Sequence, residues 1–255
     1  MSDQIKINLR SIKAFESIGN DSLKLLEKEA QVVKFPMGFP ILNASFIPNK
    51  IFILLSGEVR YVDNSSTKIK TIDKCGKNSF IGLSSLLNIY GNEYAIASTE
   101  VMALKIPDSL ILKFYNQEKT FFSWCNSRLF IAETYEFAKS FENNSNINKK
   151  LSIEKIYREI RDNGLVKISK NEQYLDSSED LLTFLGSNNV ENIKMYDLIT
   201  NKSKFKSQGE LPARLITLPK SIYKDILSSN KINNNISQAD NNENNHSSIY
   251  IENDI

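Results

Sequence analysis

The chain is poor in the residues on which most catalytic and metal sites depend. It has one histidine, His246, and two cysteines, Cys75 and Cys125, in 255 residues. So few cysteines exclude a disulfide framework or a zinc cluster, and they fit a reducing compartment such as the cytoplasm. The acidic residues form no paired motif suited to acid–base work. We therefore expect no metal site, no cofactor and no enzymatic activity.

Long apolar runs and an excess of charge of one sign are also missing. The longest apolar run, residues 51–55, is far too short to cross a membrane, and the N-terminal segment MSDQIKINLRSIK has no apolar signal core. The 32 basic and 30 acidic residues leave a net charge of +2, which gives no general attraction to nucleic acid. We expect a cytoplasmic protein with one large or two small domains.

The chain does contain a β-rich segment interrupted by single glycines. Residues 51–62 read IFILLSGEVRYV, and residues 76–106 read GKNSFIGLSSLLNIYGNEYAIASTEVMALKI. The glycines that separate the expected strands are Gly38, Gly57, Gly76 and Gly82. Short strands with glycine turns predict a small roll or barrel.

Helical patterns flank this segment, and the most informative one covers residues 119–142. Its apolar residues lie on two faces, one formed by Phe122, Cys125, Leu129 and Ala132 and the other by Phe130, Phe137 and Phe141. A helix with two apolar faces must bury both of them. We predict one long helix here that contacts a second domain or a second subunit.

These patterns predict an α+β fold in four parts. A β-roll domain with flanking helices covers residues 1–118, and the connecting or dimerisation helix covers 119–142. A small mixed α/β domain covers 150–227, after a linker at 143–150. Residues 228–255 are rich in Asn, Ser and Lys and are expected to form a disordered tail, because they bury too little apolar surface to fold.

Residues 1–142 resemble the cyclic-nucleotide-binding domain family. The resemblance is carried by LRSIKAF, FPMGFPIL, ILLSGEVRYV, SFIGLSSLL and ASTEVMALKIP, in that order. It implies an antiparallel β-roll, also called a double-stranded β-helix or jelly roll. It also implies a phosphate cassette, in which a glycine is followed by a glutamate for the ribose and, further along, by an arginine for the cyclic phosphate. Backbone amides of a short helix complete the anion site.

The cassette positions carried over to this chain lack the residues that hold the nucleotide. The positions carried over are Gly82, Leu83, Ser84, Ser85 and Ala97. Leu83 stands where the family has glutamate, and Glu93 stands near the place of the arginine. Losing the arginine–phosphate pair should cost roughly 3–6 kcal/mol, or about 10²–10⁴-fold in affinity. Lys74 and Lys77 are the nearest cations in the sequence that could supply charge.

Two interpretations remain open for the C-terminal half. In the first, residues 178–199 form a helix-turn-helix, and Lys202, Lys204 and Lys206 meet a DNA backbone. In the second, 181–185 and 193–198 are strands and GELPARLITLP is an extended return. The second arrangement resembles the regulatory region at the N-terminus of cyanobacterial peptide-exporting ABC transporters.

The sequence therefore predicts a bacterial regulatory or sensor protein built on a degenerate cyclic-nucleotide-binding-like domain. Nucleotide binding is expected to be lost or altered, and the chain is expected to act through a protein partner, in an export-associated setting, or as a homodimer. The alternative is a DNA-binding transcription regulator of the catabolite-activator type that dimerises through residues 119–142. A helix at 190–198 would favour that alternative.

Overall fold

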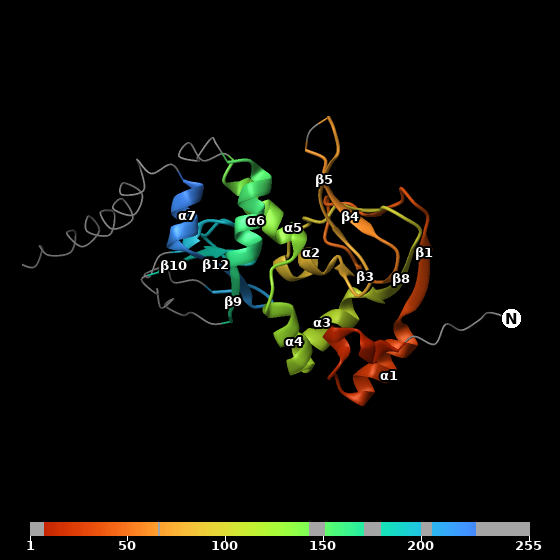
Figure 1. The fold of residues 1–255 in the computed structure, drawn as a ribbon. Helices are drawn as coiled ribbons and strands as arrows, with labels where there is room; N and C mark the ends of the chain where they lie inside the picture. Colours follow the sequence, from red (N-terminus) through yellow and green to blue (C-terminus); the bar gives the residue numbers. More distant parts are fainter. Residues whose placement is uncertain (1–7, 66, 143–150, 171–179, 200–205, 228–255) are drawn as a thin grey trace, which may run out of the picture.

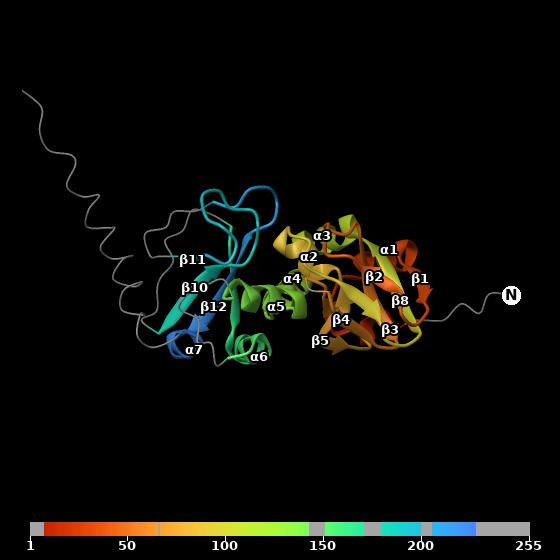
Figure 2. The ribbon, with the colours of Figure 1, turned by 90° about the horizontal axis from the view of Figure 1, so that it is seen from above.

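The fold is described from a computed structural model over residues 8–65, 67–142, 151–170, 180–199 and 206–227. A β-roll with its N-terminal helices lies on one side of helix α5 (Ile131–Ser140), and a C-terminal sheet lies on the other (Figures 1 and 2). The predicted linker 143–150 and tail 228–255 fall outside the described residues. Within the described residues, no helix is long and apolar enough to cross a membrane.

Two four-stranded antiparallel sheets form the β-roll. Their strand orders are β1-β8-β3-β6 and β2-β7-β4-β5. The strands are β1 (Gln31–Phe35), β2 (Pro40–Leu42), β3 (Lys50–Ser56), β4 (Val59–Asp63), β5 (Lys70–Cys75), β6 (Phe80–Ile81), β7 (Ala95–Ala97) and β8 (Val101–Pro107). This confirms the predicted α+β fold with an N-terminal antiparallel β-roll.

Strand β3 supplies side chains to two separate cores, because alternate residues of a strand point to opposite faces. Ile51 and Ile53 pack against helices, whereas Phe52 and Leu54 pack inside the roll. The chain then turns at Gly57, whose φ of 86° is in the left-handed region. A Cβ at this position would lie 2.3 Å from the carbonyl oxygen of Glu100, so the turn requires glycine.

Short helices cover the outer face of the first sheet. They are η1 (Leu9–Ser11), η2 (Lys13–Phe15), α1 (Asn20–Glu29), α3 (Asp108–Gln117) and α4 (Lys119–Asn126). Phe15, Phe114 and Phe121 meet beneath them, with ring centroids 5.7–6.3 Å apart. These buried aromatic contacts hold the N-terminal helix η2 against α3 and α4.

The prediction of one long helix over residues 119–142 is wrong. Helix α4 ends at Asn126 and α5 begins at Ile131, because Phe130 is extended (φ −92°, ψ 156°) and its N–H donates to Glu133 Oε2 at 3.2 Å. Apolar residues at helical spacing on both sides of the break explain why the sequence favours a continuous helix. The two predicted faces are also not kept. Phe122, Cys125 and Phe130 pack with the N-terminal helices, Ala132 packs inside the roll, and Leu129 packs with Phe137 and Phe141.

Helix α5 lies between the two halves of the chain. Ala132 packs on the interior cluster of the β-roll, whereas Phe137 and Phe141 pack against the C-terminal sheet. Figure 2 shows α5 between the strands of the roll and β10 and β12. The partner expected for the second apolar face is therefore a second domain of the same chain.

The C-terminal half is a four-stranded sheet with two helices. Its elements are α6 (Ile153–Asn163), β9 (Leu165–Ser169), β10 (Leu181–Leu185), β11 (Leu198–Ile199), β12 (Ala213–Pro219) and α7 (Lys220–Ile226), and the strand order is β11-β10-β12-β9. Strands and turns occupy residues 180–199. The strand predicted at 181–185 is confirmed, but the strand predicted at 193–198 is wrong, because turns and irregular backbone occupy 191–197 and β11 begins only at Leu198. The helix-turn-helix interpretation is wrong, because the described residues 180–199 contain no helix.

The C-terminal sheet repeats the first sheet of the β-roll strand for strand. The order β9-β12-β10-β11 corresponds to β1-β8-β3-β6. In both sheets, the first residue of the edge strand (β1 or β9) pairs with the residue that is third from the end of the neighbouring strand (β8 or β12). The first residues of β3 and β10 both lie opposite a closing proline, Pro107 and Pro219. A helix then follows each proline, α3 in one copy and α7 in the other.

Local hydrogen bonds repeat as well. Asn78 and Tyr196, which precede β6 and β11, have positive φ values of 69° and 71°. Their N–H groups donate to Leu54 O at 2.8 Å and Leu185 O at 2.6 Å. Counterparts of β2, β4, β5 and β7 do not occur among the C-terminal residues that the structure describes. The C-terminal half is thus a shortened structural repeat of the β-roll that keeps one sheet.

Candidate functional site

The predicted cassette residues gather at the start of helix α2 (Leu83–Asn88), directly after β6. Gly82 is the residue before the helix and has a left-handed φ of 96°. Leu83, Ser84 and Ser85 are buried in the first turn. Ala97, the last predicted position, is buried at the end of β7. The structure therefore brings the glycine and the short helix together as the resemblance implies.

The side chain of Glu93 lies on the backbone amides at the start of α2. Its Oε1 accepts a hydrogen bond from Gly82 N at 2.9 Å, and its Oε2 accepts one from Ser85 N at 3.0 Å. The hydroxyl of Tyr61, on β4, donates to Oε1 at 3.1 Å. Glu93 is 2% exposed. Amides at a helix start favour an anion, and here a side chain of the protein supplies it.

A second set of hydrogen bonds closes the loop around this carboxylate. The hydroxyl of Ser85 donates to Asn92 Oδ1 at 3.0 Å, and Asn92 Nδ2 donates to the hydroxyl of Ser84 at 3.3 Å. Asn92 is 7% exposed. The serines that were predicted as ligand residues therefore bind neighbouring residues of their own loop.

Burial controls the titration of the groups at this site. Burial raises the pKa of Glu93, although the amides of Ser85 and Gly82 act in the opposite direction. Burial also raises the pKa of Tyr61 well above its ordinary value, and the neighbouring Glu93 adds to the effect. Tyr61 is therefore a neutral donor to the carboxylate across the physiological range.

The space between β4 and α5, next to the cassette, is small and carries acidic groups. It is a cavity of about 200 Å³ whose lining includes Asp63, Tyr135, Glu136 and Lys139. Tyr135 donates to Asp63 Oδ2 at 2.8 Å, and Lys139 Nζ lies 3.4 Å from Asp63 Oδ1 and 3.9 Å from Glu136 Oε1. A phosphate here would meet two carboxylates and a lysine that already has partners.

Asp63 gives a test of how α5 is held on the roll. Burial opposes ionisation, but hydrogen bonds from Ser65 and Tyr135 and the charge of Lys139 lower the pKa of Asp63 to about 2. Since this folded-state pKa is depressed, the stabilisation is present at neutral pH and is lost as the pH falls toward 2. We expect wild type to lose about 1–2 kcal/mol more than Asp63→Asn over this range. Urea unfolding of both proteins at about pH 6 and about pH 3 measures this, and parallel losses would contradict it.

The most highly bonded side chain in the structure is one that the sequence analysis did not select, Arg214 on β12. Its Nε lies 2.5 Å from Glu133 Oε1, and its Nη2 donates to Glu133 Oε2 at 3.0 Å and to Arg128 O at 2.5 Å. Its Nη1 donates to Cys125 O at 3.2 Å and Asn126 Oδ1 at 3.1 Å. Arg214 is 2% exposed. It joins the C-terminal sheet to the break between α4 and α5.

The predicted lysine cluster is only partly described. Lys206 is exposed, whereas Lys202 and Lys204 lie outside the described residues. Lys74, the cation suggested as a replacement for the arginine, pairs with Glu58 Oε1 at 2.8 Å on the β4–β5 hairpin. Of the lysines that the structure describes here, neither Lys74 nor Lys206 pairs with Glu93, the side chain that lies on the cassette amides.

Neither cysteine is a reactive thiolate. Burial raises the pKa of Cys75 and of Cys125 to about 12, so both are neutral thiols at physiological pH. Among the described residues, no group of His, Cys, Asp and Glu could hold a metal ion.

No protein-family model matches the sequence, and no curated protein matches it significantly. Several solved structures, in contrast, are similar to this chain. A cyclic nucleotide-binding-like protein from Brucella abortus is 19% identical, with a TM-score of 0.37, over 43% of this chain and 95% of that one. The N-terminal domain of a transcriptional regulator from Streptomyces coelicolor is 17% identical, with a TM-score of 0.37, over 45% and 82%.

A third structure is matched by both halves of the chain. The regulatory domain of Toxoplasma gondii PKA, solved with cAMP, is 11% identical, with a TM-score of 0.40, over 92% of this chain and 94% of that one. Identities and TM-scores this low say nothing about the ligand or partner of this chain. The structures that it is similar to are cyclic nucleotide-binding domain proteins, and its own strand order shows the antiparallel β-roll that the resemblance predicts.

Proposed function

We propose that the protein is a non-enzymatic regulatory module that does not bind cyclic nucleotides and acts through a protein partner. The observation that carries the proposal is the Glu93 carboxylate on the amides of Gly82 and Ser85, buried to 2% exposure. The Glu93 carboxylate, which is part of the chain, already occupies the amides that would otherwise bind a phosphate. A free cyclic phosphate would have to displace it.

The cost of that displacement supports the proposal. Each hydrogen bond to a charged group contributes about 1.5–3 kcal/mol, and Glu93 accepts three. A second anion beside the carboxylate would add repulsion in a site with little water. Residues 76–101, which include the cassette, contain no arginine that could pair with the phosphate in compensation.

Titration calorimetry of the wild-type chain with cyclic AMP and with cyclic GMP tests the proposal. We expect no heat of binding up to millimolar nucleotide. Micromolar binding at one site per chain would overturn the proposal. In that case Lys74→Ala, on β5, and Lys77→Ala, in the turn between β5 and β6, would show whether one of these exposed lysines replaces the missing arginine.

A protein partner is favoured over DNA because residues 181–185 and 198–199 are strands. The DNA-binding alternative needs a recognition helix in this part of the chain. We expect the chain to show no salt-dependent affinity for duplex DNA in an anisotropy titration. Binding that weakens steeply with added salt would restore the transcription-regulator alternative. The resemblance of residues 150–227 to the regulatory region of peptide exporters stays a prediction.

A further inference from the structure

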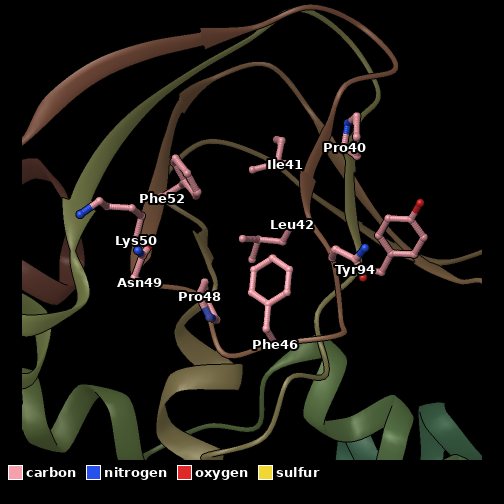
Figure 3. Close-up of a pocket in the computed structure, with 10 residues that line it drawn as sticks. Pro40, Ile41, Leu42, Phe46, Pro48, Asn49, Lys50, Phe52 and Tyr94 are labelled. Atoms are coloured by element: carbon pink, nitrogen blue, oxygen red, sulfur yellow. The ribbon is translucent and has the colours of Figure 1, made fainter.

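An apolar cavity of about 370 Å³ opens on the β-roll between β2 and β3. Ile41, Leu42 and Phe52 form its floor and are 7–9% exposed. Figure 3 shows these three side chains directed toward one space, with the rings of Phe46 and Pro48 at its lower side. An engineered cavity of about 150 Å³ lined by Leu, Ile and Phe holds benzene. The cavity between β2 and β3 is therefore large enough for a molecule of roughly two rings.

A local irregularity of β2 shapes the floor of this cavity. Ile41 and Leu42 are neighbours in the sequence, and side chains of neighbouring strand residues normally point to opposite faces. The pairing of β2 with β7 shifts register between Pro40 and Leu42. Such a bulge changes the direction of a side chain, and both Ile41 and Leu42 line the cavity.

The apolar surface of the cavity is recessed. Among the described residues, Phe46 is the only exposed large hydrophobic side chain that also lines the cavity, and it is 58% exposed. Met37, Phe39 and Ile47 are exposed too, but none of them lines it. Protein partners bind apolar groups that are spread over a surface, whereas small molecules bind in concave and mainly apolar pockets of about 300–1,000 Å³. The shape of this cavity favours a small molecule.

The charge distribution favours a neutral ligand. Lys50 is the one charged residue that lines the cavity, and in Figure 3 its ammonium group points away from the floor. The other polar side chains of the lining are those of Asn43, Asn49 and Tyr94, which form hydrogen bonds without a charge. An ionised group seated on the floor would lose its water and gain no partner of opposite charge there.

The loop that carries Phe46 is held in place from both sides. Asn43 Oδ1 accepts hydrogen bonds from Ser45 N at 3.1 Å and from the Ser45 hydroxyl at 2.9 Å. On the other side, the loop packs against Gly91 so closely that a Cβ there would lie 2.7 Å from Ala44 O and 2.8 Å from Phe46 N. The cavity is therefore formed before a ligand arrives, which lowers the entropic cost of binding.

The wall of the cavity adjoins the cassette glycine. A Cβ at Gly82 would lie 3.1 Å from Pro48 Cγ and 3.3 Å from Lys50 O, and both of these residues line the cavity. The N–H of Gly82 donates to Glu93 on the other side. A ligand packed on Pro48 would contact the residue that touches Gly82, while Glu93 stays on its amides.

We propose that this cavity binds a neutral and mainly apolar small molecule of roughly one or two rings. Leu42, Phe46 and Phe52 contact its apolar body, and any polar group lies at the rim, where Asn43 and Asn49 are exposed. The inference goes beyond the proposed function and stands independently of it, because such a ligand uses neither the cassette amides nor a protein partner.

Fluorescence titration of the full chain with Prodan tests this inference. Prodan is a neutral naphthalene dye with two fused rings and a carbonyl group, and its emission shifts to the blue in apolar surroundings. We expect saturable binding in the micromolar range with one dye per chain. Leu42→Trp fills the cavity and should lower the affinity about tenfold or more, and Phe46→Ser removes an apolar wall and should lower it about fivefold.

The matched control is Phe39→Ser, which removes an exposed phenylalanine that does not line the cavity and should bind as wild type. Circular dichroism shows whether Leu42→Trp folds. The exposed position of Phe46 keeps the test decisive if it does not.

Several results would overturn the inference. They are an absence of saturable Prodan binding, affinity that is unchanged in Phe46→Ser, and an equal loss of affinity in Phe39→Ser, which would place the dye on the general apolar surface. Self-association of wild type that is lost in Phe46→Ser would also overturn it, by assigning the cavity to a second copy of the chain. Calorimetry with cyclic nucleotides tests the proposed function separately, so that failure of one leaves the other standing.

Discussion

Replacing Arg214 by methionine is expected to lower the free energy of unfolding by about 3–5 kcal/mol, the range for breaking a buried ion pair by removing one partner. Glu133, which is 0% exposed, would be left as a buried charge without its cation. The carbonyl oxygens of Cys125 and Arg128 would lose a donor as well. Equilibrium unfolding in urea, followed by circular dichroism, measures the loss.

The double variant Arg214→Met/Glu133→Met separates the charge from the hydrogen bonds. It removes the isolated carboxylate, so about half of the lost stability should return, while the two carbonyl oxygens stay without a donor and Phe130 N–H loses its acceptor. Arg214→Lys keeps the charge but not the planar fork, and it should lie between wild type and Arg214→Met. If Arg214→Met unfolds at the same urea concentration as wild type, the central role given to this contact is wrong.

Replacing Glu93 by alanine is expected to destabilise the fold by about 2–4 kcal/mol and to make its stability depend on added anions. The amides of Gly82 and Ser85 lose their shared acceptor, whereas the hydroxyl of Tyr61 keeps the carbonyl oxygen of Phe80 at 3.2 Å. Each unsatisfied buried amide costs about 1–3 kcal/mol. Phosphate can then sit on the vacated amides. At ten times its dissociation constant it would return about 1.4 kcal/mol. Thermal unfolding with increasing phosphate measures both effects.

The control for this experiment is Glu118→Ala, which removes a carboxylate that accepts from Gly19 N and from the Ser22 hydroxyl at a more exposed site. Phosphate also stabilises proteins generally by exclusion from their surface, and wild type and Glu118→Ala report that background. An equal response to phosphate in all three proteins would mean that Glu93 does not occupy an anion site.

The sequence was sufficient to predict the β-roll and the place of the cassette, because both depend on short-range patterns. The run of apolar residues at 51–55 and the glycine after it indicate β3 and its turn, although the contact that requires glycine there, with the carbonyl oxygen of Glu100, is not visible in the sequence. Glu93 was located near the arginine position, but its role was not predictable. Whether a carboxylate reaches the amides of Gly82 and Ser85 depends on the path of the loop between them, which no spacing rule supplies.

Arg214 and the structural repeat were missed for a related reason. The visible signal was an arginine inside the apolar strand Ala213–Pro219, but its partner Glu133 is 81 positions away in the sequence. The two copies of the sheet keep their apolar pattern and few identities, such as Pro107 with Pro219 and Ser109 with Ser221. The correspondence between the two sheets became clear from the register of their paired strands. Register depends on which residues pair across two strands, so it cannot be predicted from one strand alone.

The separation between Glu133 and Arg214 also sets a delay during protein synthesis. A ribosome adds about 5–20 residues per second, so the 81 positions between the two residues take roughly 4–16 seconds to translate. During that interval the β-roll strands can pair, but the carboxylate of Glu133 has no cation and the apolar face of Phe137 has no sheet to cover it. The nascent N-terminal half therefore keeps an unpaired carboxylate and an uncovered apolar face until the C-terminal sheet is made. Slow translation of the C-terminal half would lengthen the exposure of this intermediate to chaperones and proteases.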